Sequence, residues 1–226
     1  RYGEAVDEVG LWKSEKIIFN KYINKDNKIL DLGCGAGRTT INLYKLGYKN
    51  IIGLDLSTNL IQYANNYIKD NNLDINFVVG DATKLEYEDN SFDIVIFSFN
   101  GMQCIPGKIN RDNVLKEVYR VLKPGGLYIF TAHNRDDSGS HQKEWDEEKI
   151  KWENGTQDSN LEIYGDRYTI DRTGEIAFVH FSNIEEMIDF INQEDFEIIE
   201  YKKSTDIAEE IEKTKGIDTN DISKYD

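Results

Sequence analysis

The segment 31–37, DLGCGAG, has the residue types and spacing of a ligand-binding loop. It follows an apolar run with strand character and precedes a stretch with helical periodicity. Glycines at such a turn let the backbone change direction sharply and come close to a ligand. In open α/β sheets, ligands bind beyond the carboxyl ends of the strands. We therefore expect Gly33 and Gly35, with Asp31 beside them, to belong to a ligand site.

Two classes of ligand compete for this loop. A dinucleotide fingerprint has the spacing GxGxxG. Gly33 and Gly35 fit it, but Arg38 occupies the position of the third glycine, and the extra glycine is Gly37. Asp31 precedes the first glycine by two residues, where a carboxylate repels a pyrophosphate but attracts a cation or an ammonium group. The loop therefore favours a ligand other than a dinucleotide.

Two further acidic residues follow the next two predicted strands. Asp55 ends the run 51–55, and Asp81 follows the run 77–79. A carboxylate at the end of the second strand is placed to accept hydrogen bonds from both ribose hydroxyls, in a dinucleotide or in an adenosyl ligand. Asp81 is placed to accept a hydrogen bond from an adenine amino group, while the amide of Ala82 serves a ring nitrogen.

Some of these residues also have purely structural explanations. Asp55 is able to cap the helix that follows it, and Asp81 is able to stabilise a turn. Gly37 is better explained by close packing of a helix, and Cys34 by filling a small buried space. The segment 124–126, PGG, predicts a turn and not a site.

The elements that must position these residues alternate between strands and helices. Short apolar strands that alternate with amphipathic helices predict a parallel sheet covered on both faces, and right-handed crossovers make it doubly wound. We therefore expect a doubly wound, Rossmann-like α/β fold with a mostly parallel sheet. The predicted strands are 29–32, 50–55, 75–79, 92–97 and 127–131, and the predicted helices are 11–23, 38–46, 57–70 and 108–123.

The alternation ends after residue 133. The stretch 134–160 is polar, and two segments with strand character, 161–170 and 175–181, are joined by the turn sequence of 171–174. We interpret 134–181 as an insertion that forms a β-hairpin and a substrate lid over the sheet. A helix over 184–192, a strand over 196–201 and an acidic, helix-prone tail from residue 204 follow. No sharp boundary divides the chain, so residues 1–226 predict a single domain.

The composition is that of a soluble globular protein. The chain has 226 residues, a net charge of −15 and 39% hydrophobic residues. This acidity disfavours nucleic acids and anionic membranes as partners, because both attract basic surfaces. No apolar run is long enough to span a membrane, and no signal segment is recognisable. Two cysteines without a zinc-site pattern indicate a reducing cytoplasm and no metal site.

The ordered set of motifs resembles the class I S-adenosylmethionine-dependent methyltransferases. Its pieces are ILDLGCGAGRTT, IIGLDLS, VVGDAT, FDIVIFSFN and EVYRVLKPGGLYIFT, in the family's order and at its spacing. The resemblance covers residues 29–131, which it implies are the cofactor-binding core. It implies S-adenosylmethionine as cofactor and methyl transfer as the activity, with an unidentified small-molecule acceptor.

The resemblance also implies individual roles. Asp31 lies near the amino group of the methionine portion, beside Gly33 and Gly35, and Asp55 holds the ribose. The remaining implied contacts are Leu56 flanking the adenine, Asp81 and Ala82 reading its edge, and Ser98 and Phe99 lining the methionine side.

Few residues are suited to remove a proton from the acceptor. His133 follows the fifth predicted strand near the rim of the cleft, and His180 lies in the predicted hairpin. Both are candidate general bases, although a single histidine is often structural. The segment 98–101, SFNG, lacks the paired prolines of the family's amino-methylating DNA enzymes, which argues against that subgroup. The tryptophans Trp145 and Trp152 either line the acceptor pocket or pack within the insertion.

Other functions are compatible with the same residues. A non-methylating enzyme, such as an aminopropyl transferase, or a non-catalytic cofactor-binding module would use the same loop, because a fold does not determine a reaction. A nicotinamide-dependent dehydrogenase is disfavoured by the loop spacing and by Asp31. The family's sheet usually ends with an antiparallel seventh strand, but no apolar segment follows residue 201. Either the hairpin region replaces this strand or the chain stops short, and we favour the second explanation.

Overall fold

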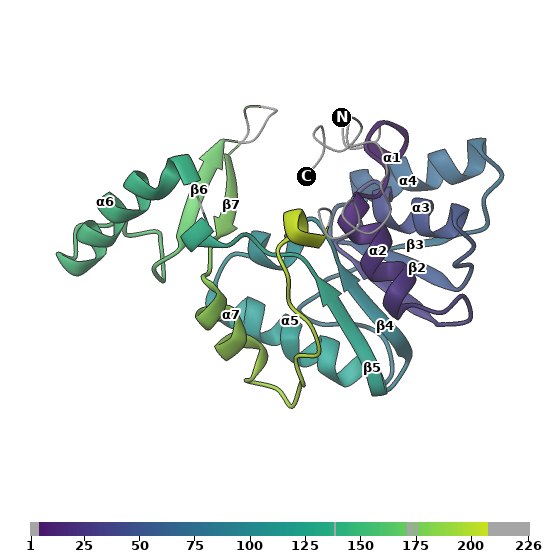
Figure 1. Cartoon of the computed structure of the whole chain (residues 1–226). Helices are drawn as coiled ribbons and strands as arrows, with labels where there is room; N and C mark the ends of the chain where they lie inside the picture. The colour runs from purple at the N-terminus through teal and green to yellow at the C-terminus, as the bar shows by residue number, and fades with distance from the viewer. Residues whose placement is uncertain (1–4, 138, 171–173, 175, 208–226) are drawn as a thin grey trace.

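Five parallel strands form the central sheet, in the order β3-β2-β1-β4-β5 (Figure 1). This computed structural model describes residues 5–137, 139–170, 174 and 176–207. The strands are β1 (Ile29–Leu32), β2 (Ile51–Asp55), β3 (Asn76–Val79), β4 (Phe92–Phe97) and β5 (Leu122–Phe130). β1 is central and pairs in parallel with both β2 and β4. The predicted doubly wound, mostly parallel α/β fold is confirmed.

Helices cover both faces of this sheet. The helices of the described chain are α1 (Ala5–Glu8), α2 (Lys13–Tyr22), α3 (Arg38–Lys45), α4 (Thr58–Asp70), α5 (Lys108–Val121), α6 (Gln142–Glu153) and α7 (Ile184–Ile191), with short 3₁₀ turns η1 (Gly101–Cys104), η2 (Arg135–Asp137) and η3 (Gly139–His141). Of these, α6 stands apart from the sheet (Figure 1). None of the helices in the described part of the chain is long and apolar enough to cross a membrane.

The alternation of side chains along the strands divides the core into two layers. Leu30 of β1 and Val95 of β4 pack with Val118 of α5 on one face. Ile29 packs with Phe19 of α2 and with α3 on the opposite face. Both faces of the sheet bury apolar side chains, so the strand sequences are nearly continuous hydrophobic runs. This pattern is the signal that predicts the strands from the sequence.

Local sequence signals set several helix boundaries. The Ser57 hydroxyl accepts a hydrogen bond from the Leu60 amide and caps α4. Asn183 and Glu186 form a reciprocal capping box at the start of α7. Such caps satisfy amides that the first helical turn leaves without partners.

The PGG segment does not separate α5 from a new strand. β5 begins directly at Leu122, and its register with β4 jumps from the pair Phe92 and Leu122 to the pair Ile94 and Leu127. Residues 124–126 therefore form a bulge inside β5, with Gly125 in the left-handed region at φ 76°. A glycine and a proline are tolerated here because β5 is an edge strand.

The insertion contains the predicted hairpin and an unpredicted helix. β6 (Asp166–Ile170) and β7 (Ile176–His180) pair antiparallel, while most of the predicted connecting turn lies outside the described residues. The stretch 161–165, predicted as strand, forms a turn instead. α6 occupies part of the polar stretch 134–160, and its Trp145 is only 2% exposed because it packs against Phe181 and Arg167. The packing explanation of Trp145 is therefore the correct one. Figure 1 shows α6 and the hairpin standing together at one end of the molecule.

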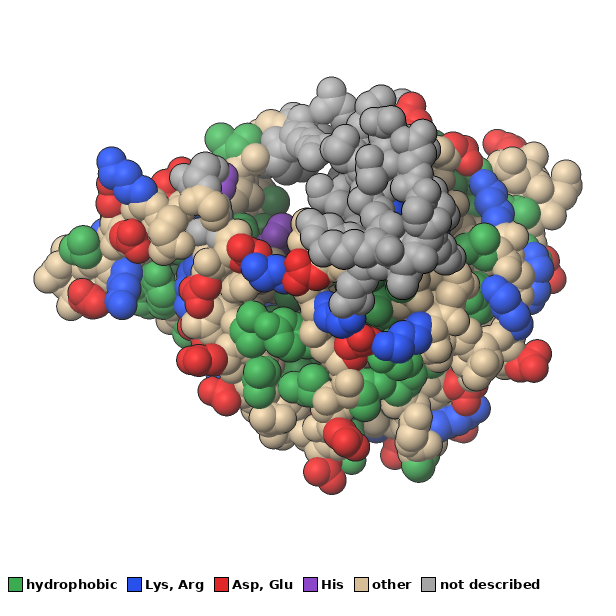
Figure 2. Space-filling view, viewed as in Figure 1, with side chains coloured by type: hydrophobic (Ala, Val, Ile, Leu, Met, Phe, Trp, Pro, Cys, Tyr) green, Lys and Arg blue, Asp and Glu red, His purple; other side chains and the backbone are tan. Residues whose placement is uncertain are grey.

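The predicted strand over residues 196–201 is wrong. These residues have no strand pairing and instead cross over the edge strand β5. Phe196 stacks edge-on against Tyr119, and Glu200 binds Lys21 of α2 at 2.8 Å. The space-filling view shows hydrophobic side chains gathered over α7 and this segment (Figure 2), where Ile199 is 58% exposed. The apolar pattern that suggested a strand therefore marks partly exposed residues.

The two-layer core predicts a large difference between two isoleucine truncations. Ile96 in the centre of β4 is fully buried, whereas Ile150 on α6 is 56% exposed. We expect Ile96→Ala to lower the free energy of unfolding by about 2–5 kcal/mol, because it removes buried methyl groups and leaves a cavity. Ile150→Ala is the matched control and should change it by less than about 0.5 kcal/mol. Urea titration followed by circular dichroism measures both, and equal effects would contradict the assigned core.

Candidate functional site

The glycine-rich loop joins the carboxyl end of β1 to α3. Gly33 has φ 59°, and a Cβ on it would lie 2.5 Å from the ring of Phe97. The amide of Cys34 donates to the carbonyl of Leu54 at 3.0 Å, so the loop is tied to the end of β2. Only glycine combines this left-handed backbone with such a close approach. A Cβ on Gly37 would lie 2.7 Å from Phe77, which confirms that this glycine permits close packing of α3.

Asp55 at the end of β2 has a carboxylate that the backbone holds in place. Its Oδ2 accepts from the Gly35 amide at 2.7 Å, and its Oδ1 accepts from the Ser57 amide at 2.8 Å. Each oxygen of a carboxylate has a second lone pair, and the residue is partly exposed. The carboxylate is therefore oriented by two amides and still able to accept hydrogen bonds from two ligand hydroxyls.

Asp31 lies under the glycine loop and is 1% exposed. Its Oδ2 accepts a hydrogen bond from the Thr40 hydroxyl at 2.5 Å, and its Oδ1 has no partner among the described residues. Burial raises the pKa of the Asp31 carboxyl to about 7. A buried oxygen without a partner is costly, so it marks a place where a bound donor group would be favourable.

The residues predicted to contact an adenine lie on the loops after β2 and β3. Asp81 is exposed, and its Oδ1 accepts from the amide and the hydroxyl of Thr83. Leu56 is 72% exposed, an unusual exposure for a large apolar side chain next to a polar loop. The amide of Gly80 donates to the carbonyl of Asp55 at 3.0 Å, which holds these two loops side by side.

The loop after β4 is held in an uncommon backbone conformation. Ser98 is buried, whereas Phe99 is 52% exposed. Phe99 and Asn100 have φ 57° and 60°, in the left-handed region that residues other than glycine seldom adopt. The Asn100 amide donates to the Thr131 hydroxyl at 2.9 Å, which ties this loop to the end of β5. Strained backbone of this kind is typical of ligand sites.

A buried ion pair beside this loop was not predicted from the sequence. Arg38, the first residue of α3, forms two hydrogen bonds to Glu15 of α2, at 2.6 and 2.7 Å. The Arg38 guanidinium also lies 5.2 Å from the ring centre of Phe99 and 5.5 Å from that of Trp12. The pair therefore fixes the N-terminal segment and the aromatic rings next to the glycine loop. Its partners are 23 positions apart, so no local pattern identifies them.

His133 lies where the sequence places it, beside the loop after β4. Its Nε2 is 3.1 Å from the side-chain amide nitrogen of Asn100, and its ring stacks on Phe181 at 4.9 Å. Since an amide nitrogen only donates, Nε2 acts as the acceptor in this contact. Partial burial lowers the pKa of His133 below its ordinary value of 6.5. The imidazole is therefore held in the neutral form that a base requires.

The backbone of His133 is fixed by Gln103, another residue that sequence reasoning missed. Gln103 is 1% exposed, and it both accepts from the His133 amide at 2.6 Å and donates to the His133 carbonyl. It also donates to the Ser182 hydroxyl at 3.0 Å. These bonds join the end of β5 to the end of the hairpin through one buried side chain.

His180 lies away from His133 and from the predicted cofactor residues. Its Nδ1 is 2.9 Å from Asp166, and it lines a different cavity, between the hairpin, α5 and α7. None of the nine residues predicted to hold the cofactor lines that cavity. The structure therefore brings the predicted cofactor residues to one edge of the sheet with His133 nearby, and it places His180 apart from them.

The donor set of this edge suits an adenosyl amino acid. One carboxylate is oriented by amides and the other has an oxygen that lacks a partner among the described residues, and both suit ligand groups that carry hydroxyls or a positive charge. The glycine loop also borders this edge of the sheet. The exposed side chains of Leu56 and Phe99 provide apolar surface for a ligand. Among the described residues, no group of three or more His, Cys, Asp or Glu side chains is arranged to hold a metal ion.

The raised pKa of Asp31 predicts a dependence of stability on pH. The folded protein without ligand retains a proton that the unfolded chain releases near pH 4, so the free energy of unfolding should fall as pH rises from about 4 to about 7. Asp31→Asn does not titrate. Between pH 5 and pH 8, wild type should lose about 3 kcal/mol relative to this variant.

Urea titrations at the two pH values measure this difference. Asp74→Asn, at an exposed position, is the matched control and should follow wild type. A slope with pH that is the same for wild type and Asp31→Asn would contradict a protonated, buried Asp31.

Comparison with known proteins supports this interpretation of the site. Residues 29–126 match the protein family described as a methyltransferase domain. Demethylmenaquinone methyltransferase from Lactobacillus johnsonii is 46% identical over 101 residues, which is 43% of this chain and 40% of that protein. Sterol 24-C-methyltransferase from Kluyveromyces lactis is 34% identical over 128 residues, 54% of this chain and 33% of the relative. The matches therefore span less than half of the length of these relatives.

A solved structure extends the likeness in fold to most of the chain. An S-adenosylmethionine-dependent methyltransferase from Methanosarcina mazei superposes with a TM-score of 0.67 at 23% identity, over 87% of this chain and 92% of that one. At this level of identity the likeness concerns the fold. Residues 29–126 thus match the methyltransferase-domain family, and most of the chain shares the fold of an S-adenosylmethionine-dependent methyltransferase.

Proposed function

We propose that this protein transfers the methyl group of S-adenosylmethionine to a small-molecule acceptor. The observation that carries the proposal is the Asp55 carboxylate, which two backbone amides orient beside the glycine loop. When bound, S-adenosylmethionine supplies the methyl group and the sulfide leaving group. The protein's own part is to position both reactants and to exclude water, which accounts for much of the rate in such reactions.

In this proposal each residue of the edge has a defined task. Asp55 accepts hydrogen bonds from the ribose hydroxyls, and Asp31 stabilises the ammonium group beside Gly33 and Gly35. Leu56 covers a face of the adenine, and Asp81 with the amide of Ala82 binds its edge. Ser98 and Phe99 line the methionine side, where the methyl group faces the acceptor.

The acceptor is proposed to be a small molecule and not a nucleic acid. The relatives named above act on a demethylmenaquinone and a sterol, as their names state. The net charge of −15 disfavours the counterion release that drives binding to nucleic acids. Both cysteines are free in the structure, which is compatible with the reducing cytoplasm that we propose as the location.

We further propose that residues 1–226 form one domain in which 134–181 acts as a lid on the acceptor side. The two ends of this segment meet near the carboxyl end of β5, where His133 stacks on Phe181 and Gln103 binds Ser182. Replacement of residues 142–160 by a short glycine and serine linker should alter the choice among acceptors and leave cofactor affinity unchanged. Unaltered acceptor selectivity would exclude the lid.

The role of Asp55 predicts a specific loss of cofactor affinity. In calorimetry, wild type should bind S-adenosylmethionine and S-adenosylhomocysteine, and Asp55→Ala should weaken both by at least about 100-fold. The reason is the loss of two hydrogen bonds to a charged group, each contributing about 1.5–3 kcal/mol. NAD should not bind.

Two further variants make this measurement specific. Asp26→Ala, at an exposed turn, is the control and should bind like wild type. Asp55→Asn retains an acceptor oxygen for only one of the two backbone amides, because the Gly35 and Ser57 amides bind different oxygens of Asp55, so it should weaken cofactor binding as well. Unchanged affinity in a folded Asp55→Ala protein, or binding of NAD alone, would refute the proposed cofactor site.

The neutral imidazole of His133 predicts a pH profile for a protic acceptor. A base acts only when deprotonated, so kcat/KM should rise with pH through the pKa of His133, which lies below 6.5 because of partial burial. In His133→Gln this acidic limb should disappear and kcat should fall by about 100-fold, while cofactor affinity stays constant. His141→Gln, at an exposed position, is the control. An acidic limb that persists in His133→Gln would exclude His133 as the base.

A further inference from the structure

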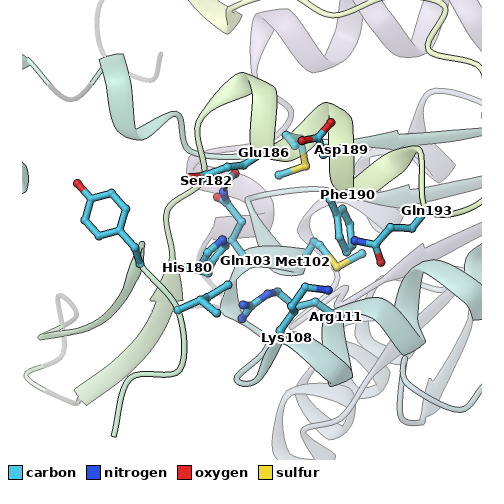
Figure 3. A pocket seen from close by; sticks show the side chains of 13 residues that line it. Met102, Gln103, Lys108, Arg111, His180, Ser182, Glu186, Asp189, Phe190 and Gln193 are labelled. Carbon is cyan, nitrogen blue, oxygen red and sulfur yellow. Dashed lines mark hydrogen bonds between the residues drawn. The ribbon is translucent and has the colours of Figure 1, made fainter. Parts of the chain in front are cut away.

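A second cavity lies apart from the cofactor edge, between the hairpin, α5 and α7 (Figure 3). Its volume is about 400 Å³, within the usual range of about 300–1,000 Å³ for small-molecule sites. Its apolar lining comes from Met102, Ile163, Met187 and Phe190. The structure describes all the residues that line this cavity. None of the four apolar residues has a role in the proposed methyl transfer.

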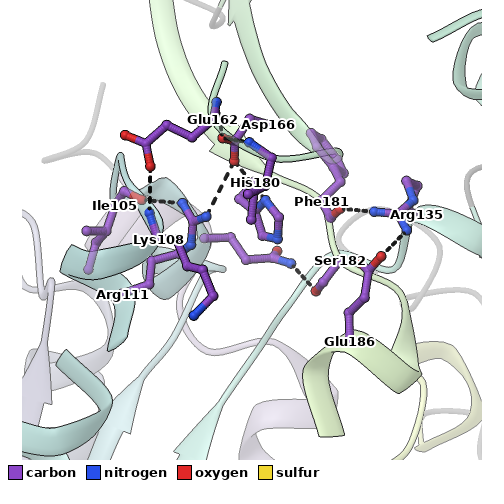
Figure 4. A network of polar contacts seen from close by, with 12 residues as sticks. Ile105, Lys108, Arg111, Arg135, Glu162, Asp166, His180, Phe181, Ser182 and Glu186 are labelled. Carbon is purple, nitrogen blue, oxygen red and sulfur yellow. Dashed lines mark hydrogen bonds and ion pairs between the residues drawn. The ribbon is translucent and has the colours of Figure 1, made fainter. Parts of the chain in front are cut away.

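The imidazole of His180 forms part of the wall of this cavity and is 9% exposed. Its Nδ1 lies 2.9 Å from Oδ1 of Asp166, as Figure 4 shows. A carboxylate only accepts hydrogen bonds, so Nδ1 carries the proton of the neutral ring. Among the described residues, Nε2 of His180 forms no hydrogen bond. This nitrogen is therefore left to accept a hydrogen bond, on a residue that is largely buried.

Asp166, which is itself held by several hydrogen bonds, fixes the orientation of the His180 ring. Asp166 Oδ2 accepts from the amides of Glu162 and Ile163, both at 3.1 Å, and Arg111 approaches Oδ1 at 3.4 Å. Burial alone would raise the pKa of Asp166, but the hydrogen bond from His180 and the one from the Ile163 amide lower it below its usual value. A carboxylate that is ionised and fully hydrogen-bonded holds the imidazole in a single tautomer.

The charges around the cavity select against an anionic ligand. The Arg111 charge is already matched by Asp166, and Lys108 at the rim is paired with Asp112 at 2.7 Å. Glu186 and Asp189 also line the cavity and would repel a carboxylate or a phosphate. A neutral molecule that donates one hydrogen bond and presents an apolar body matches this lining better.

We propose that this cavity is a binding site for a phenol, that is, an aromatic molecule whose acidic hydroxyl donates a hydrogen bond to Nε2 of His180. The methionine and phenylalanine side chains suit an aromatic ring. An alcohol is a weaker hydrogen-bond donor than a phenol. The site does not depend on the proposed methyl transfer.

The test uses p-cresol and 4-methylanisole, which have nearly the same shape but differ in the hydroxyl proton. The chain has only three histidines, so ¹⁵N spectra of the side chains report on each ring separately. Before any addition, His180 should show the tautomer protonated at Nδ1. On titration with p-cresol, the Nε2 resonance of His180 should shift and saturate, while those of His133 and His141 stay in place.

The expected affinity for p-cresol is at least about tenfold higher than that for 4-methylanisole, which corresponds to one hydrogen bond. His180→Gln should remove this preference, and His141→Gln, at an exposed position, should retain it. The comparison of the two probes is made in the wild-type protein, so it does not depend on how the variant folds. Equal affinities, or saturation without any shift of His180, would overturn the proposal, because the cavity would then bind by apolar contact alone.

Discussion

The parallel pairing of β1 with both β2 and β4 is the constraint on which the rest of the structure depends. Parallel neighbours end at the same edge of the sheet, so the loops that follow them must meet there. The amide of Gly35 consequently reaches the Asp55 carboxylate, and the amide of Gly80 reaches the Asp55 carbonyl. The convergence of the proposed ligand-binding residues at this edge is a direct result of the strand order.

Buried polar contacts attach the remaining segments to that edge. Arg38 and Glu15 join the N-terminal segment to the glycine loop, Gln103 joins β5 to the hairpin, and Asp166 joins the hairpin to α5 through Arg111. Burying charges is costly, and breaking one partner of such a pair is strongly destabilising. We interpret these contacts as determining the arrangement of the segments, with the apolar layers on both faces of the sheet contributing most of the stability.

The two histidines show why residue type alone does not assign a role. His133, after the fifth predicted strand, and His180, in the predicted hairpin, are equal candidates as bases from the sequence. In the structure His133 contacts Asn100 on the cofactor side, whereas His180 is held by Asp166 in a separate cavity. The difference arises from the packing of the hairpin against α5 and η1, which no local pattern encodes.

The sequence by itself determined the alternating elements, the strand-to-helix glycine loop and the acidic residues at the strand ends, because these depend on local periodicity and on neighbours along the chain. The sequence wrongly predicted a strand at residues 196–201, where an apolar run does not pair with the sheet. It also did not predict α6, a largely polar helix with one buried tryptophan. Only the tertiary structure decided the ion pair of Arg38 with Glu15, the bonds of Gln103 and the environment of His180. Those contacts join residues distant in the chain, and their geometry exists only once the layers have packed.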